Sequence, residues 1–468
     1  NIRYTMVSTA MSKDGYSRRK YMGLAGAMAA GGLAGCSGSG NNDGGTSGGD
    51  SGGDSDGGGD SGSTSGSGGG GSDITVWTQD ITANKPETQQ FINDAISGNV
   101  EFAEMRYDNI KQQFLTGAST GTPDVLEVTP NHRGDYVSAE HLEPITDRVE
   151  ELDYADGYIG MDTMTYRDDI WALPHIGNGR GFVYRQDIFE KYGFDVPEQW
   201  SDFVTIGSEI TKNEDGMHGF TLTSESTNTR VLQEFLSFTF QRVDSIFDAD
   251  GDGFTLNPSP EDFGVVFKEY FYDPFFATDT PATDPNARGI GSLDHDISYV
   301  NGNYAAISTG PWIPGLASNS DNTNEEAMEN YRNSAATHNP RVEGGEQGTY
   351  AEIKPIMMNT HSDSKEEAWQ VQKATASPEG IRTFLEEDPG DLPAHEDVDW
   401  TVPETTDNPD WAGFQDVFAT GKSYGFWSVS QVSTDLFDLV QEVIYDETDP
   451  MDAGQQLHDA WAEQASEI

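Results

Sequence analysis

The feature that most constrains this sequence is an alternation of strand and helix signals between residues 73 and 128. Three runs typical of strands alternate with two runs of helical spacing, at residues 73–77, 86–96, 100–107, 109–117 and 123–128. Strands that alternate with helices pair in parallel and need helices to cover the sheet. The sequence therefore predicts an α/β fold. Ligands in such sheets bind beyond the strand ends, which places candidate pocket walls after Trp77 and after Val128.

Later segments predict further helices around a buried core. Residues 230–240 carry apolar side chains at helical intervals, which is typical of a core helix. Ser259 and Pro260 open another helix with a cap and early acidic residues. Ser201 is the predicted N-cap of a helix that runs to residue 210. Three more helices are predicted at residues 364–376, 378–387 and 434–445.

The N-terminal residues predict export. Paired arginines, Arg18 and Arg19, precede an apolar run of small residues from 23 to 34. This order is typical of a twin-arginine signal, and the run is shorter than the roughly 20 residues that span a bilayer core. We expect residues 1–35 to be removed as a signal.

Cys36 is the only cysteine, so the chain cannot form an internal disulfide. It directly follows Leu33-Ala34-Gly35, which resembles the lipobox of exported lipoproteins and predicts lipidation of the Cys36 thiol. A small buried cysteine is the alternative. Residues 36–72 continue as Gly, Ser, Asp, Asn and Thr with no apolar side chain after the cysteine, so we expect a disordered tether with a reach of about 30 Å.

The charge of the chain is strongly negative. The formal net charge is −54, and removal of residues 1–35 takes away five basic residues and one acidic residue, which leaves 21 basic and 79 acidic residues and a charge of −58. Such self-repulsion is screened in molar salt, where the Debye length is about 3 Å. We expect a halophilic, archaeal source. The same charge argues against nucleic acid as a partner.

Two blocks of the chain, one on each side of its midpoint, carry a family resemblance. Residues 171–203 are similar to a stretch that runs from Leu-Pro through Tyr-Asn-Lys-Asp to Pro-x-Thr-Trp-x-Glu, and residues 301–312 are similar to Gly-x-x-Ala-Met-x-x-x-Gly-Pro-Trp. Both blocks are typical of the family 1 extracellular solute-binding proteins, and the likeness runs in order from residue 73 to residue 468. The resemblance implies capture of a small solute and delivery to an ABC permease in the membrane. It also implies a monomer with no catalytic residues.

The resemblance implies a two-lobed fold of the periplasmic-binding-protein type II, with the ligand cleft between the lobes. Each lobe would hold a mostly parallel sheet flanked by helices. The predicted first lobe comprises residues 73–178 and 342–385, and the predicted second lobe comprises residues 179–341 and 386–468. Hinge crossings would fall near residues 178–181 and 342–350, where glycines can absorb backbone rotation.

The resemblance also implies ligand-binding residues. Trp312 stands at the Gly-Pro-Trp tryptophan, which stacks on sugar in the maltose-binding branch, and Trp427 resembles a second cleft aromatic. Asn131 and Asn178 stand where that branch has acidic ligands, so a sugar is predicted but not maltose in particular. Weaker candidates by position are His132, His175, Gln79 and Asp80. Apolar faces of a pyranose do pack on Trp rings, although a core position is the alternative for both tryptophans.

Three alternatives remain open. An exported glycoside hydrolase with paired carboxylates is the main functional alternative. A surface adhesin would need a pattern of short strands, which the long helical segments oppose. Asp248, Asp250 and Asp252 are spaced like half of a calcium loop, but Ser259 replaces the bidentate Glu, so a solvated acidic turn is favoured over calcium and no cofactor is expected.

Overall fold

The described part of the chain is the body that follows the predicted tether. A computed structural model describes residues 73–78, 85–96, 98–105, 107–128, 130–251, 253–318, 323–388, 390–399, 408–423 and 425–465. The predicted signal, Cys36 and tether lie outside these residues, as do Gln79, Asp80 and Asp252. Within the described residues, no helix is both long and apolar enough to cross a membrane.

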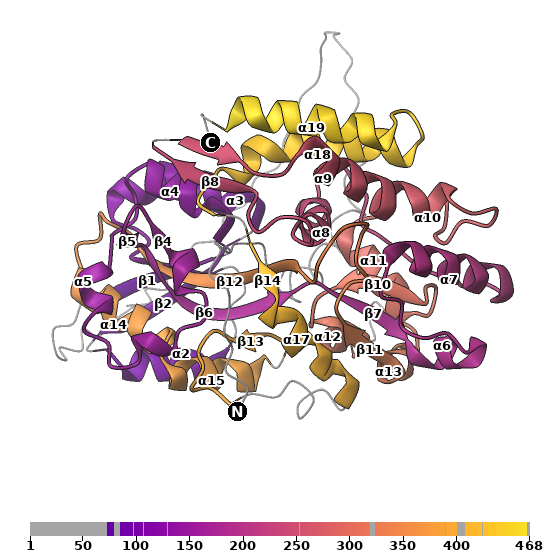
Figure 1. Ribbon diagram of the computed structural model, residues 1–468. Coiled ribbons are helices and arrows are strands. Elements are labelled where there is room, and N and C mark those ends of the chain that lie inside the picture. The colour runs from indigo at the N-terminus through magenta and orange to yellow at the C-terminus, as the bar shows by residue number, and fades with distance from the viewer. Residues whose placement is uncertain are drawn as a thin grey trace, which may run out of the picture.

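The predicted strand–helix alternation forms one side of a seven-stranded sheet. Strands β1 (Asp73–Thr78), β2 (Asn99–Glu104) and β3 (Val125–Glu127) pair in parallel, and α2 (Pro86–Asp94) and α3 (Tyr107–Gly117) connect them. The sheet order is β13-β6-β12-β3-β1-β2, and β14 pairs with β12. The remaining strands are β6 (Ala172–Gly179), β12 (Thr349–Met358), β13 (Leu392–Pro393) and β14 (Gly421–Lys422). We call the body around this sheet the first lobe (Figure 1).

Short elements and two late helices complete the first lobe. Helix α14 packs on β12, and α15 packs on α2. Both helices lie within one residue of their predicted bounds. The elements are η1 (Ala118–Thr120), η2 (Pro130–His132), α4 (Arg133–Ser138), α5 (Thr146–Val149), η3 (Ala155–Gly157), η4 (Met161–Met164), β4 (Thr165–Tyr166), β5 (Asp169–Ile170), α14 (Lys365–Thr375) and α15 (Pro378–Glu387).

A three-stranded sheet lies at the centre of the second lobe. Strand β7 (Gly181–Arg185) runs between β10 (Ala306–Thr309) and β11 (Ser334–Thr337), and both pairings are antiparallel. In the first lobe, β12 is also antiparallel to β3 and β6. The α/β fold is confirmed, but the expectation of mostly parallel sheets is wrong, because distant segments supply β10, β11 and β12 and local connections do not fix their direction.

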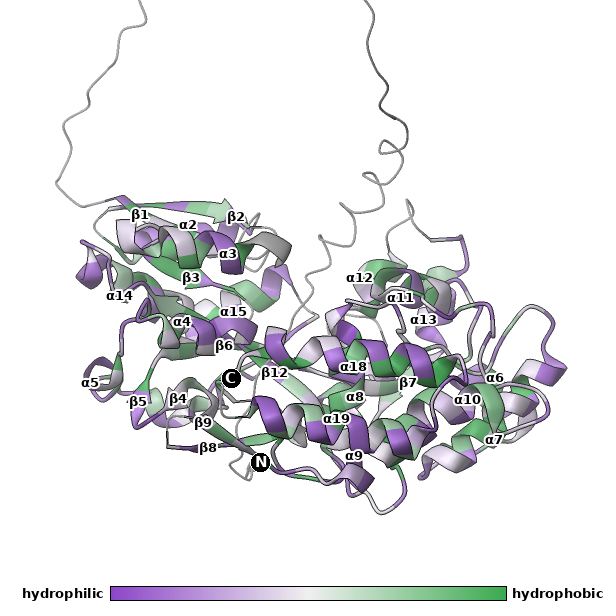
Figure 2. Ribbon diagram, turned by 90° about the horizontal axis from the view of Figure 1, so that it is seen from above, coloured by the Kyte–Doolittle hydropathy of each residue, from purple (hydrophilic) through white to green (hydrophobic). Residues whose placement is uncertain are grey.

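Helices surround the second sheet and enclose a large aromatic core. Figure 2 shows the two lobes side by side, with β6 and β12 extending between them. The elements are α6 (Gln186–Tyr192), α7 (Trp200–Asn213), α8 (Thr229–Thr239), β8 (Phe247–Asp250), β9 (Gly253–Leu256), α9 (Pro260–Val266), the π-helical η5 (Phe267–Tyr272), α10 (Asp273–Phe276), α11 (Ser292–Val300), α12 (Ile313–Ala317), α13 (Ala327–Arg332), η6 (Pro409–Ala412), α17 (Gly413–Ala419), α18 (Val429–Ile444) and α19 (Pro450–Gln464).

Capping residues in the sequence predicted one helix start correctly and another one wrongly. Ser259 and Asp262 form the predicted cap as a reciprocal capping box at the start of α9. The predicted cap at Ser201 is wrong, because α7 begins one residue earlier at Trp200, whose buried ring belongs to the core. The core helix at residues 230–240 is confirmed as α8, in which every residue from Arg230 to Thr239 is buried.

The chain crosses between the lobes where β6 ends and β7 begins, and again before β12. At the first crossing, the backbone N–H of Arg180 donates to the carbonyl oxygen of Tyr350 at 2.9 Å. The carbonyl oxygen of Arg180 accepts from the Asn339 side chain at 3.1 Å. Strand β13 pairs with β6 of the first sheet, although it lies beyond residue 385. The lobe boundaries therefore stay predictions.

Candidate ligand-binding site

A pocket of about 450 Å³ lies between the two lobes. The first lobe contributes Lys111 from α3 and Asn131 and His132 from η2. The second lobe contributes the turn before α8, the first residue of α8 and one face of α18. The second-lobe lining residues are Ser226, Thr227, Thr229, Val429, Ser430, Ser433, Thr434, Phe437 and Asp438. Both the volume and the position between two lobes are typical of small-molecule sites.

Most of the side chains that line this pocket are small and polar. Serine and threonine hydroxyls come from both second-lobe segments, and Asn131 adds an amide that can donate and accept. Phe437 supplies an aromatic surface and is mostly buried. Thr227 has a φ of 77°, which is uncommon for a β-branched residue. The lining can therefore satisfy several hydroxyl groups of a ligand and cover an apolar face.

The positive charge of Lys111 is compensated at the pocket wall. Its ammonium lies 2.7 Å from Oδ2 of Asp135 and donates to Oγ of Ser430 across the lobes at 2.9 Å. Burial alone would raise the pKa of Asp135, but the neighbouring His132 and the Lys111 ammonium, together with the Ser428 hydroxyl, hold that pKa below its usual value. Asp135 is therefore ionised and neutralises Lys111.

Of the eight predicted ligand-binding residues, Asn131 and His132 line this pocket. Asn178 and His175 lie on β6 inside the first sheet and are buried. The Asn178 amide donates to Oε1 of Glu352 at 3.2 Å, and Nδ1 of His175 lies 3.2 Å from Oε1 of Glu127. Gln79 and Asp80 fall outside the described residues. All eight ligand roles stay predictions.

Trp312 lies at the start of α12 in a buried charged network. Its side chain is 4% exposed, and its indole N–H donates to Oδ2 of Asp296 at 2.8 Å. The guanidinium of Arg180 lies over the indole ring at 4.4 Å, and that of Arg230 lies at 5.7 Å. Stacking of a sugar on the face covered by Arg180 would require that guanidinium to move.

The same network continues along α8. Arg230 pairs with Glu234 at 3.0 Å and with Asp296 at 2.8 Å, and all three side chains are fully buried. Burial raises the pKa of Glu234. Burial, together with repulsion from Arg230 and Arg180, lowers the pKa of His295 well below its usual value. His295 is thus held neutral at neutral pH.

Trp427 packs in the core of the second lobe. Its side chain is 1% exposed, and its ring centroid lies 5.1 Å from that of Phe247. Trp427 belongs to the aromatic core around Phe247 and Trp461. Trp312 belongs to a different cluster of buried hydrophobic side chains, which includes residues of β6 and β12. In this conformation neither tryptophan exposes a ring face, which agrees with the core alternative.

Sequence reasoning missed most of the second-lobe lining. The polar run from residue 224 to residue 229, directly after the strand-like residues 219–223, was the available signal, because such turns lie at strand ends in α/β folds. Ser430 and Thr434 carried no signal, since their exposure depends on how α18 packs in space.

The acidic run forms a hairpin. Asp248 and Asp250 lie on β8, which pairs with β9, and the two carboxylates accept from Ser245 and Thr255 at 2.6 Å and 3.3 Å. In the described part of the chain, no three His, Cys, Asp or Glu side chains come together as candidate metal ligands. Asp252 is outside that part, so the calcium alternative stays untested.

Comparisons with known proteins extend this description. The family model for bacterial extracellular solute-binding proteins matches residues 87–381. The GacH receptor of Streptomyces glaucescens, solved unliganded and with acarbose, superposes with a TM-score of 0.68 at 17% identity over 84% of this chain and 98% of that one. Thermus thermophilus maltotriose-binding protein, bound with maltotriose, superposes with a TM-score of 0.61 at 19% sequence identity, over 83% of this chain and 98% of that one. Maltose-bound T. maritima MalE3 superposes with a TM-score of 0.68 at 19% sequence identity, over 83% of this chain and 98% of that one.

The family match covers more than half of the chain, and the superpositions confirm the two-lobed fold. Proteins of this family are non-catalytic, so the glycoside hydrolase alternative is wrong. The chain belongs to the bacterial extracellular solute-binding proteins, which bind small solutes for ABC importers.

Proposed function

We propose that this protein binds a sugar or a short oligosaccharide in the pocket between its lobes and delivers it to an ABC importer. The observation that carries the proposal is the chemistry of the pocket, in which hydroxyls and an amide from opposite lobes surround about 450 Å³ with one aromatic surface beside them. A sugar offers the matching combination of many hydroxyls and apolar C–H faces.

Similar structures support the same class of ligand. The three neighbours were solved with acarbose, maltotriose and maltose respectively. An uncharged solute also suits the charges at the pocket wall, because Asp135 balances Lys111 and the remaining carboxylate, Asp438, is exposed to solvent. Asn131 stands where the maltose-binding branch has an acidic ligand, so we expect a sugar other than maltose to bind most tightly.

A thermal-shift screen in molar KCl tests the proposal. A ligand that binds only the folded state stabilises it by about 2.7 kcal/mol at a concentration of 100 times its Kd. We expect at least one sugar from a panel of mono- and oligosaccharides to raise Tm, and amino acids and polyamines to leave it unchanged. A rise in Tm with an amino acid or a polyamine, and with no sugar, would overturn the proposal.

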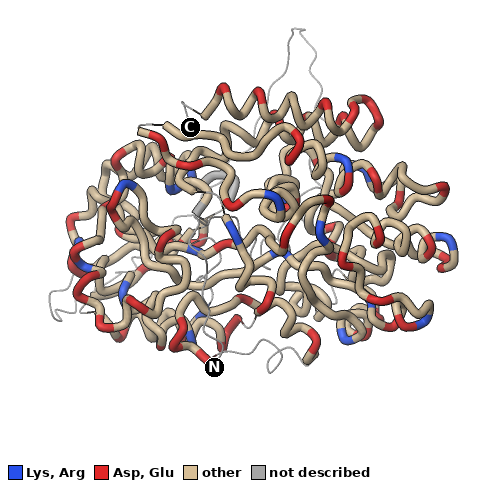
Figure 3. Tube along the Cα trace, in the orientation of Figure 1, with Lys and Arg blue, Asp and Glu red and all other residues tan. Residues whose placement is uncertain are grey.

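We further propose that Cys36 carries the lipid anchor and that residues 37–72 hold the binding lobes away from the membrane. The predicted twin-arginine signal and the Leu-Ala-Gly-Cys sequence support the anchor. A halophilic source is supported by the distribution of charge, since Figure 3 shows acidic residues along both lobes and far fewer basic ones. Molar salt would screen that repulsion.

A further inference from the structure

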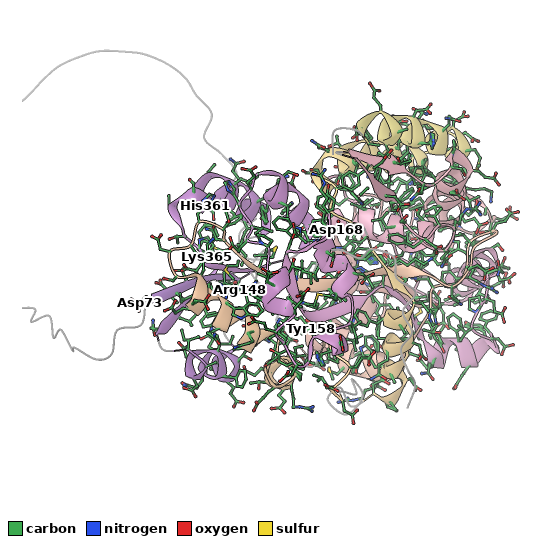
Figure 4. The ribbon with its side chains drawn as sticks, turned by 60° about the vertical axis from the view of Figure 1, so that its left-hand side comes forward. Asp73, Arg148, Tyr158, Asp168, His361 and Lys365 are labelled. Atoms are coloured by element: carbon green, nitrogen blue, oxygen red, sulfur yellow. The ribbon has the colours of Figure 1, made fainter. Side chains whose placement is uncertain are left out.

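Two β-hairpins, one from each lobe, meet beside the ligand pocket. In the first lobe, β4 and β5 are joined by Arg167 and Asp168, whose φ angles of 52° and 67° are those of a tight hairpin turn. Nη2 of Arg167 donates to the carbonyl oxygen of Gly251 at the tip of the β8–β9 hairpin, at 3.4 Å. Figure 2 shows β8 and β9 next to β4, and Figure 4 shows Asp168 where the two lobes meet.

An aromatic stack joins the lobes at the base of these hairpins. The Tyr166 ring is nearly parallel to that of Phe254, at 6.2 Å and 13°, and to that of Phe426, at 5.0 Å and 12°. The Arg133 guanidinium lies 4.5 Å from the centre of the Phe426 ring. First-lobe side chains, Tyr166 and Arg133, thus interleave with second-lobe rings, and Tyr166 packs against the second-lobe core.

Polar contacts continue this strip toward the pocket. Ser428 donates to Oδ1 of Asp135 at 2.9 Å, and Lys111 donates to Ser430. Gly134 approaches the second lobe so closely that a Cβ there would lie 1.8 Å from the carbonyl oxygen of Phe426. The lobes therefore touch from the hairpin tips to the wall of the pocket.

We infer that Tyr166, Arg167, Phe254 and Phe426 form an interlobe clasp, which stabilises the closed arrangement of the lobes and thereby sets the affinity for the solute. None of these four residues lines the pocket between the lobes. They act on affinity through the fraction of molecules that is closed, because the apparent Kd rises as the binding-competent fraction falls. The effect on affinity rests on the proposed function, whereas the effect on closure does not.

The clasp gives the acidic hairpin a role other than calcium binding. Asp248 and Asp250 are exposed on β8, next to the tip that Arg167 contacts. Their carboxylates can attract the guanidinium only at low ionic strength, because molar salt screens exposed charges. In concentrated salt the stacked rings supply the contact, since salt does not screen it.

Small-angle X-ray scattering on the unliganded protein in 2 M KCl tests the clasp without any ligand. Tyr166→Leu removes the ring but keeps an apolar side chain, and Tyr166→Phe keeps the ring as the matched control. We expect the radius of gyration of Tyr166→Leu to increase relative to wild type, and that of Tyr166→Phe to stay unchanged. Equal radii of gyration for all three proteins, with equal Tm values, would show that the contact does not hold the lobes closed and would overturn the inference.

Calorimetric titration with maltotriose, or with the sugar that gives the largest rise in Tm, measures the consequence for affinity. Two aromatic contacts of this kind predict an affinity about 5- to 100-fold weaker for Tyr166→Leu and an unchanged affinity for Tyr166→Phe. An unchanged Kd in a variant that has opened would refute the link to affinity. If wild type binds no sugar at all, the proposed function fails, while the scattering result still decides whether the clasp exists.

Discussion

Replacement of Trp312 by phenylalanine tests the buried charged network most sharply. The substitution keeps an aromatic ring but removes the indole N–H, which donates to Asp296 at 2.8 Å. Asp296 also accepts from Arg230 and Thr309, and it is fully buried. A buried carboxylate that loses a donor cannot recover it from water.

The expected loss follows from two contacts. A hydrogen bond to a charged group contributes about 1.5–3 kcal/mol, and a desolvated cation–π contact such as that of Arg180 contributes about 0.5–2 kcal/mol, part of which the phenyl ring retains. We therefore expect Trp312→Phe to lower the free energy of unfolding by about 2–4 kcal/mol.

The matched control is Trp461→Phe. Trp461 is also fully buried, but its indole N–H donates to the neutral carbonyl oxygen of Val432 at 3.0 Å. The same change of ring size there loses only a neutral hydrogen bond, which contributes about 0.5–1.5 kcal/mol. Chemical denaturation followed by circular dichroism in 2 M KCl compares the two variants. If Trp312→Phe is no more destabilising than Trp461→Phe, the network does not have the strength that its geometry indicates.

Three further predictions concern the anchor, salt and pH. In a native-like host, Cys36→Ser should release the protein into the medium, and a wild-type protein that is already soluble and unlipidated by mass spectrometry would contradict the anchor. Tm should rise as KCl goes from low to molar concentration, because screening relieves the repulsion of a charge of −58, and a flat or falling curve would contradict the halophilic source. In the unfolded chain His295 takes up a proton below about pH 6.5, whereas in the folded protein its lowered pKa keeps the side chain neutral. Protonation therefore favours the unfolded state, and the free energy of unfolding falls with falling pH by up to about 1.4 kcal/mol per pH unit. His295→Gln should reduce that slope between pH 6.5 and pH 5, as measured by denaturation, and an unchanged slope would show that His295 is not held neutral.

Local order in the sequence was enough to predict the first part of the fold. The alternation between residues 73 and 128 predicted β1, α2, β2, α3 and β3, because parallel pairing follows from short helical connections. The cap at Ser259 is also a local signal, and the structure confirms it. Strand pairings between distant segments could not be predicted from local signals, so the antiparallel pairing of β10 and β11 with β7 was missed.

The site was harder to predict than the fold. Asn131 was predicted through the family resemblance, and it lies in the loop after Val128, which the order of strands and helices had marked as a candidate pocket wall. Ser430 and Thr434 were missed, because a hydroxyl on an amphipathic helix looks the same whether it faces solvent or a pocket. The position of the Arg180 guanidinium over the Trp312 ring could not be predicted from the sequence either, since the two residues are far apart in the chain and meet only through packing.

The most direct test of the account is calorimetric titration of a pocket-filling variant with the sugar that raises Tm. Thr434→Trp places a large ring in the pocket from an exposed position on α18, and Gln456→Trp adds the same ring to an exposed position of α19 that lines no described pocket. We predict that Thr434→Trp weakens binding by at least about 100-fold at unchanged Tm, while Gln456→Trp binds like wild type. Equal affinities for the two variants would show that the sugar binds elsewhere and that the pocket between the lobes is not the site.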